Sequence, residues 1–115
     1  MKPCGVRIWT DRLEESRDFY TKTLPFQVNF DGSDQGWIII GTETIDLILE
    51  KDEGEWVGRF TALSLFVDDI HATVDELREE EVEIVSGPSQ QEWGGGLCDF
   101  KDNVGNTLTL VQNPE

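Results

Sequence analysis

The residues that could act as catalysts in this chain are few and far apart. Asp46 and Glu50 lie in one predicted strand, where four residues separate the two carboxylates by about 13 Å. That separation is wider than a general acid/base pair needs. Cys4 and Cys98 have no nearby histidine that would activate a thiol as a nucleophile. Trp93–Gly96 leads into a strand, whereas a phosphate-binding loop leads into a helix.

The residue types favour stacking on a ligand more than catalysis. Trp9, Phe66 and Trp93 supply large aromatic faces, which stack on flat heteroaromatic rings and on cations. Three glycines follow Trp93 and allow the loop backbone to approach a ligand closely. Trp9 has an alternative role as core filler between modules, and Trp37 and Trp56 fit packing or rim positions.

Arg7 has two interpretations. On the uncovered side of a first strand it needs a carboxylate partner, and Asp46 or Glu50 could supply one. Its guanidinium could instead bind a carboxylate or phosphate of a ligand. A free Arg7 would indicate an anionic ligand.

A repeated unit positions these residues. Residues 5–30 read as strand, amphipathic helix and strand, and residues 61–86 repeat this pattern, with matching positions 57 residues apart. The offset matches Asp11 with Asp68 and Leu13 with Ile70. Each copy continues into two further strands, so the order is βαβββ twice. We predict an α+β fold made of two tandem βαβββ modules, 1–53 and 57–115, in a single domain.

The predicted elements follow from apolar periodicity and turn residues. The first helix begins after Asp11, with Glu14 completing a capping box, and the second begins after Asp68. The residues 86–96 are predicted as a loop. Strands are predicted over residues 4–10, 26–30, 37–40, 45–50, 61–67, 82–85, 97–100 and 107–112.

One helix per four strands covers only one face of each small sheet. The other faces carry mixed polar and apolar side chains, which suit the wall of a cavity better than a closed core. We therefore predict a ligand cavity enclosed by the modules. The predicted ligand-binding residues are Arg7, Trp9, Asp46, Glu50, Ser64, Phe66, Trp93 and Thr109.

Composition excludes some classes of partner. The 115 residues carry 24 acidic and 9 basic side chains, a net charge of −15. Nucleic acids and anionic membranes would be repelled, whereas a cationic ligand would be attracted. No apolar run approaches a membrane span and no signal peptide opens the chain, so a cytoplasmic location with two unpaired thiols is expected.

Several motifs together resemble a known superfamily. They are Leu13-x-x-Ser16-x-x-Phe19-Tyr20, Val67-Asp68-Asp69-Ile70, Trp93-Gly-Gly-Gly96 and Asp102-x-x-Gly105-Asn106-Thr107-Leu108. In this order they resemble the vicinal oxygen chelate (VOC) superfamily, which includes glyoxalase I, extradiol dioxygenases and bleomycin-resistance proteins. The resemblance implies the glyoxalase/bleomycin resistance/dihydroxybiphenyl dioxygenase fold. In the last turn, Asn103 and Val104 replace the family's usual Pro and Asp.

The catalytic members of this superfamily hold a divalent metal with His and Glu side chains. Those positions fall here on Gly5, Asp46, Ala62 and Thr109, of which only Asp46 could be a ligand. His71 lies in the first turn of the second helix, opposite its buried stripe. We therefore predict no metal and no cofactor.

The resemblance implies a metal-independent protein that sequesters a small, cationic or aromatic molecule, as bleomycin-resistance proteins do, and that forms a homodimer. Two alternatives stay open. One is a metal-dependent glyoxalase- or extradiol-dioxygenase-like enzyme, whose ligand positions would have been misplaced by a register slip. The other is a module that acts through protein–protein contact.

Overall fold

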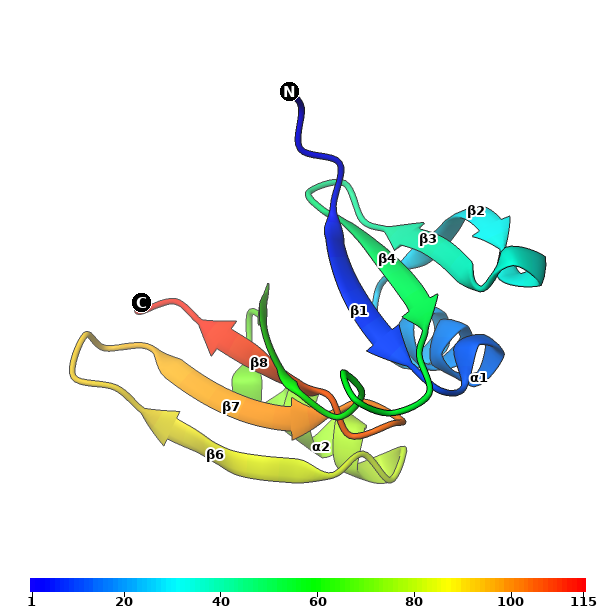
Figure 1. The fold of residues 1–115 in the computed structure, drawn as a ribbon. Helices are drawn as coiled ribbons and strands as arrows, with labels where there is room; N and C mark the ends of the chain where they lie inside the picture. Colours follow the sequence, from blue (N-terminus) through cyan, green and yellow to red (C-terminus); the bar gives the residue numbers. More distant parts are fainter. The chain divides into compact units, whose positions relative to one another are not determined.

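The computed structural model describes residues 1–115 and contains eight strands, two α-helices and two short helical segments, Phe19–Thr23 and Ser33–Gln35 (Figure 1). Neither helix has the length and apolar character that a membrane-spanning helix requires. The chain divides into two compact units, Met1–Gly58 and Arg59–Glu115, each with a four-stranded sheet and a helix. The elements are β1 (Val6–Thr10), α1 (Leu13–Asp18), β2 (Gln27–Gly32), β3 (Trp37–Gly41), β4 (Asp46–Lys51), β5 (Phe60–Phe66), α2 (Ile70–Glu79), β6 (Ile84–Gln90), β7 (Gly96–Lys101) and β8 (Thr107–Gln112).

The first unit has the strand order β1-β4-β3-β2, in which β1 runs parallel to β4 and the other pairs are antiparallel. α1 packs on β3 and β4 and covers one face of the sheet (Figure 1). A hydrogen bond of 2.6 Å between the buried hydroxyls of Thr10 and Ser16 joins β1 to this helix. The core under the helix consists of Ile8, Leu13, Tyr20, Leu24, Phe26, Ile38, Ile40, Leu47 and Leu49.

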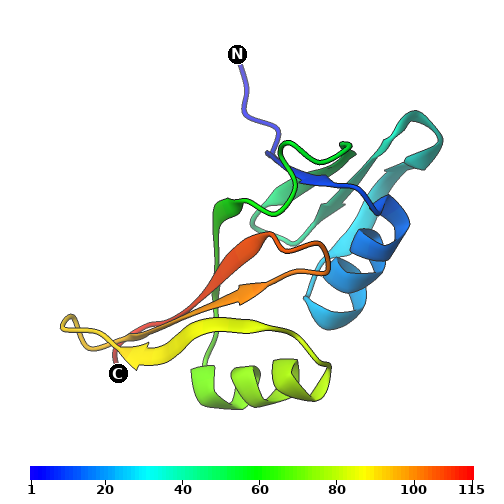
Figure 2. The ribbon, with the colours of Figure 1, turned by 60° about the horizontal axis from the view of Figure 1, so that its bottom comes forward.

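The second unit repeats this arrangement. Its strand order is β5-β8-β7-β6, again with one parallel pair, β5 with β8. α2 packs on β6, β7 and β8, and Figure 2 shows it lying along one side of this sheet. The apolar core here consists of Leu63, Ile70, Val74, Leu77, Cys98, Phe100, Leu108 and Leu110. The predicted α+β fold with two βαβββ modules is confirmed.

The predicted helix starts were wrong in detail. Asp11 makes no capping bond, and the α1 cap position is Arg12, whose backbone N–H donates to the Thr10 hydroxyl. In the second unit the cap is Asp69, not Asp68, and it accepts from the backbone N–H of Ala72 at 3.1 Å. Adjacent acids leave the cap position undecided in a sequence, because only the backbone angles select which carboxylate reaches the helix N–H groups.

The predicted loop over residues 86–96 was also partly wrong. β6 extends from Ile84 to Gln90 and pairs with β7, with two register irregularities. One surrounds the cis peptide between Gly87 and Pro88. Glycine and proline normally mark a loop, but this strand lies at the sheet edge, where both residues are tolerated.

Both cysteines are free thiols. Cys98 is buried in β7, whereas Cys4 is exposed and precedes β1, which begins at Val6 rather than at residue 4 as predicted. Burial raises the pKa of the Cys98 thiol, and the Asp99 carboxylate adds to the increase.

Candidate functional site

Each sheet leaves the face opposite its helix open, and strand alternation decides which side chains lie there. We call the open side of the first sheet the first open face. Its side chains are half-buried or exposed, in contrast to the core on the other side. The first open face consists of Arg7, Trp9, Phe30, Trp37, Ile39, Asp46, Ile48 and Glu50.

Arg7, Trp9 and Glu50 form a connected cluster on the first open face. The Arg7 Nε lies 3.5 Å from a Glu50 carboxylate oxygen, and the Arg7 Cζ lies 5.5 Å from the centroid of the Trp9 ring. Trp56 extends the cluster, because its ring centroid lies 5.7 Å from that of Trp9 at an angle of 32°. The arginine thus has the carboxylate partner that one of its two interpretations required.

Trp56 reaches Trp9 because an acidic turn fixes the loop after β4. The Asp52 carboxylate accepts hydrogen bonds of 3.1 Å from the backbone N–H groups of Gly54 and Trp56. The bond from Trp56, followed by that from Gly54, lowers the pKa of Asp52. Sequence reasoning assigned Trp56 to packing or the rim, and the contact with Trp9 makes it part of this aromatic surface.

Asp46 lies on the same face, next to β3 and β2. Its Oδ1 accepts a hydrogen bond of 3.1 Å from the Asn29 side-chain amide. This bond passes above Gly41, where an added Cβ would collide with both side chains. Asp46 also lines a shallow pocket of about 430 Å³ formed by residues 3–6 and 42–46.

The open side of the second sheet, the second open face, is more polar. Ser64 and Thr109 are neighbours across β5 and β8, and Thr109 donates a hydrogen bond of 2.6 Å to the Asp99 carboxylate. Phe66 is 76% exposed. The second open face consists of Ser64, Phe66, Ser86, Leu97, Asp99, Lys101, Thr107, Thr109 and Val111.

Sequence reasoning missed Asp99, although its signal was present. Cys98 and Phe100 are apolar and lie under α2, so strand alternation puts Asp99 on the opposite side. Its carboxylate also lies 3.4 Å from the Ser86 hydroxyl. Thr109, a predicted site residue, is therefore engaged with a carboxylate of its own sheet.

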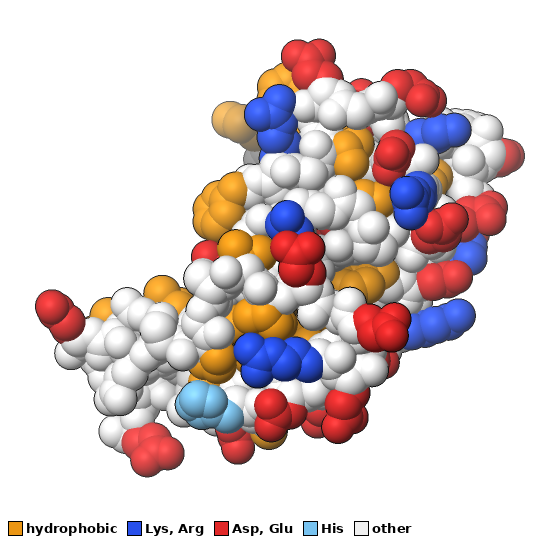
Figure 3. Space-filling model, turned by 90° about the horizontal axis from the view of Figure 1, so that it is seen from below, with side chains coloured by type: hydrophobic (Ala, Val, Ile, Leu, Met, Phe, Trp, Pro, Cys, Tyr) orange, Lys and Arg blue, Asp and Glu red, His pale blue; other side chains and the backbone are white.

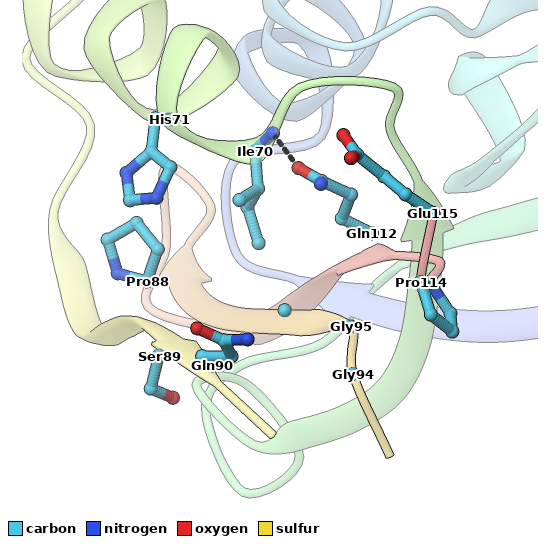
Figure 4. A pocket seen from close by; sticks show the side chains of 11 residues that line it. Ile70, His71, Pro88, Ser89, Gln90, Gly94, Gly95, Gln112, Pro114 and Glu115 are labelled. Carbon is cyan, nitrogen blue, oxygen red and sulfur yellow. Dashed lines mark hydrogen bonds between the residues drawn. The ribbon is translucent and has the colours of Figure 1, made fainter. Parts of the chain in front are cut away.

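Trp93 lies in the hairpin between β6 and β7 and is 50% exposed. Its ring covers Gly95, where an added Cβ would overlap the indole. Beside this hairpin lies a second pocket of about 430 Å³, between the start of α2 and the C-terminal residues. Figure 4 shows the Gln112 side chain pointing to the start of α2. Its Oε1 accepts a hydrogen bond of 2.7 Å from the backbone N–H of Ile70. Gly94–Gly96 line this pocket and Trp93 does not.

The residues at the superfamily's metal positions do not fit a metal. Gly5 and Ala62 have no ligating side chain, and Thr109 is hydrogen-bonded to Asp99. No group of three or more His, Cys, Asp or Glu side chains is arranged to hold an ion. Asp46 alone cannot form such a site.

Known proteins resemble this chain over almost its full length. The protein YetH of Bacillus subtilis (strain 168) is 27% identical over 114 residues, which cover 93% of this chain and 94% of YetH. A superfamily member from Sphaerobacter thermophilus DSM 20745 superposes with a TM-score of 0.82 at 24% identity, covering 98% of both chains. TnmS3, an antibiotic binding protein from Streptomyces sp. CB03234, superposes with a TM-score of 0.74 at 25% identity, covering 98% of this chain and 97% of TnmS3.

A family model spans the motifs from which the resemblance was inferred. The model described as Glyoxalase/Bleomycin resistance protein/Dioxygenase superfamily matches residues 5–110, which include both helices and all eight strands except the end of β8. The repeated βαβββ order agrees with this match. The chain therefore belongs to the glyoxalase/bleomycin resistance protein/dioxygenase superfamily.

Proposed function

We propose that this protein binds and sequesters a small organic molecule that carries a flat ring, and that it does not transform it. The carrying observation is the paired indoles of Trp9 and Trp56, with centroids 5.7 Å apart on the first open face. Trp56 is 52% exposed, so ring surface stays accessible to a ligand. Burial of a flat ring against indole faces contributes apolar area and a stacking preference.

The similarity to TnmS3 supports a binding function. TnmS3 is described as an antibiotic binding protein and covers nearly all of this chain. Metal independence is supported by the four positions that hold the metal in catalytic superfamily members. Only one of them carries a carboxylate here; the residues are Gly5, Asp46, Ala62 and Thr109. We expect Asp46 and Glu50 in the first unit, and Ser64, Phe66, Trp93 and Thr109 in the second, to contribute to ligand contacts. Arg7 belongs to the same surface through its ion pair with Glu50.

A ligand screen tests the proposal. Planar heteroaromatic compounds such as quinoline and acridine would be titrated while tryptophan fluorescence is followed. We expect saturable quenching, and Trp9→Leu should weaken the affinity about five-fold or more, since base-to-aromatic stacking is worth about 1–3 kcal/mol in other proteins. Phe60→Leu is the matched control, because Phe60 is 66% exposed and lies outside the first open face. Absence of saturable quenching with every compound would refute the proposal.

Trp93 requires its own variant. Trp93→Ala should weaken binding while the unfolding midpoint in urea stays unchanged, because half of the side chain is exposed. Unchanged affinity would show that Trp93 is not part of the binding site, which would then be restricted to the cluster around Trp9.

Elemental analysis tests the absence of a metal requirement. Purified protein would be incubated with nickel, zinc, manganese and ferrous iron and then desalted. We expect no retained metal, and retention near one equivalent would favour the enzyme alternative. Sedimentation equilibrium would test the homodimer expected from the resemblance, and cell fractionation would test the cytoplasmic location.

A further inference from the structure

Glu50 stands between two tryptophans on the first open face. The strand register places Trp9 of β1 and Trp37 of β3 directly beside Glu50 of β4. Neighbouring strands lie about 4.8 Å apart, so the two tryptophan backbones are about 10 Å apart with the carboxylate midway. Side by side, all three side chains project from the same side of the sheet.

Trp37 belongs to a second aromatic pair. Its ring stacks on that of Phe30, with centroids 5.2 Å apart and an angle of 22°. The indole lies over Gly32, where an added Cβ would come within 3.0 Å of two ring atoms. Phe30 is 55% exposed. Two aromatic pairs, Trp9 with Trp56 and Trp37 with Phe30, thus lie on the two sides of Glu50. We call the three adjacent residues Trp9, Glu50 and Trp37 the Glu50 row.

The protein already places a cation in this row. The Arg7 guanidinium lies over the Trp9 ring at 5.5 Å and against Glu50 at 3.5 Å. This pairing of an aromatic face with a carboxylate is the usual environment for an organic cation. Arg7 and Glu50 are 52% and 36% exposed as side chains, so the guanidinium can be displaced into water at small cost.

We propose that Glu50 binds the cationic group of an organic ligand, which displaces the Arg7 guanidinium, while the ligand's flat ring stacks on one of the two aromatic pairs. This inference rests on the proposed function and defines its ligand class as ring-bearing amidinium, guanidinium or ammonium compounds. The net charge of −15 favours the approach of such a cation and disfavours an anion. On the face drawn in Figure 3, acidic side chains are interspersed with basic ones rather than gathered in one patch.

Two probes of nearly the same shape test the charge requirement. Benzamidinium carries a planar cation like that of Arg7, and benzamide is its neutral counterpart. Binding would be followed by NMR through the indole N–H signals, each assigned by a tryptophan-to-phenylalanine variant. We expect benzamidinium to bind at least about three-fold more tightly than benzamide and to shift the Trp9 or Trp37 signal.

Four variants test the residues. Glu50→Gln should weaken benzamidinium binding about three- to ten-fold and leave benzamide unaffected. Arg7→Gln should strengthen benzamidinium binding about two- to five-fold, since it removes the competing guanidinium. Glu15→Gln and Arg12→Gln are matched controls, because Arg12 and Glu15 form an exposed ion pair of 3.7 Å elsewhere in the same unit. They change the net charge equally and should leave both affinities unchanged.

The outcomes separate this inference from the proposed function. Equal affinities for the two probes, or no effect of Glu50→Gln, would overturn the cation site while leaving a flat-ring binder. Tighter binding in Arg12→Gln equal to that in Arg7→Gln would also overturn it, because net charge alone would explain the gain. Failure of both probes and of the heteroaromatic panel to bind would refute the proposed function itself.

Discussion

The two units have equivalent strand orders, and each has an apolar core on the helix-covered side of its sheet, but their open faces differ. The first carries two aromatic pairs and an arginine–glutamate pair. The second carries hydroxyls around Asp99, with Phe66 as an isolated exposed ring. The helix-covered side must be apolar in both units because it excludes water, whereas the open side has no such constraint. Chemistry specific to this protein is therefore expected on the open faces.

The largest expected effect contrasts the two sides of the sheets. Tyr20, in the helical segment Phe19–Thr23 of the first unit, and Phe100, in β7 of the second, are both fully buried. Tyr20→Ala and Phe100→Ala should each lower the free energy of unfolding by about 3–5 kcal/mol. Phe66→Ala, at an open face, should change it by less than about 0.5 kcal/mol. Urea denaturation measures all three, and a large loss at Phe66 would mean that this ring is covered in solution.

The two thiols should differ strongly in reactivity. Cys4 is exposed, whereas Cys98 is buried and its pKa is raised by that burial. Because the thiolate is the reactive form, alkylation at pH 8 should be about a hundredfold slower at Cys98 than at Cys4. Mass spectrometry after timed iodoacetamide treatment provides the rates. Similar rates would show that the second unit opens readily.

The turns that join the last two strands of each unit should differ in their contribution to stability. In the second unit the Asp102 carboxylate accepts hydrogen bonds from the backbone N–H groups of Val104 and Asn106, and Asn106 Oδ1 accepts from the Arg59 N–H. Asn106 is buried, so Asn106→Ala should cost about 1–3 kcal/mol in unfolding free energy. In the first unit, Thr42 makes its side-chain bonds within an exposed turn. Thr42→Ala should therefore cost less than about 0.5 kcal/mol, and equal losses would contradict this contrast.

The smallest expected effect is an acid response of the first unit. The pKa of Asp52 is lowered in the folded state, first by the Trp56 N–H and then by the Gly54 N–H. Because the pKa of Asp52 is lower in the folded than in the unfolded chain, its ionised carboxylate stabilises the folded turn at pH values above the unfolded pKa of about 4. This stabilisation is lost as the pH falls through the folded pKa. The Trp9–Trp56 contact should therefore loosen only as the pH falls below about 4 and through this lowered pKa of Asp52, which near-ultraviolet circular dichroism would detect. Asp52→Ala should show the loosened spectrum already at pH 7, with Asp34→Ala as the control.

The sequence alone was sufficient for the fold class and for the division into faces. Alternation at Ile45–Glu50 separated Leu47 and Leu49, which are buried, from Asp46 and Glu50, which lie on the first open face. This separation is local, because successive side chains in a strand point to opposite sides whatever their neighbours are. The helix-periodic residues Ile70, Val74 and Leu77 were likewise placed in the core.

Only the tertiary structure decided which side chains meet. Arg7 pairs with Glu50, and Asp46 instead accepts from Asn29. Trp37, assigned to packing or the rim, stacks on Phe30 beside the Glu50 row. These partners depend on strand order and register, which bring β1 next to β4 across about forty residues of chain. Alternation within one strand contains no information on its neighbour, so the pairings that define the proposed cation site appear only after folding.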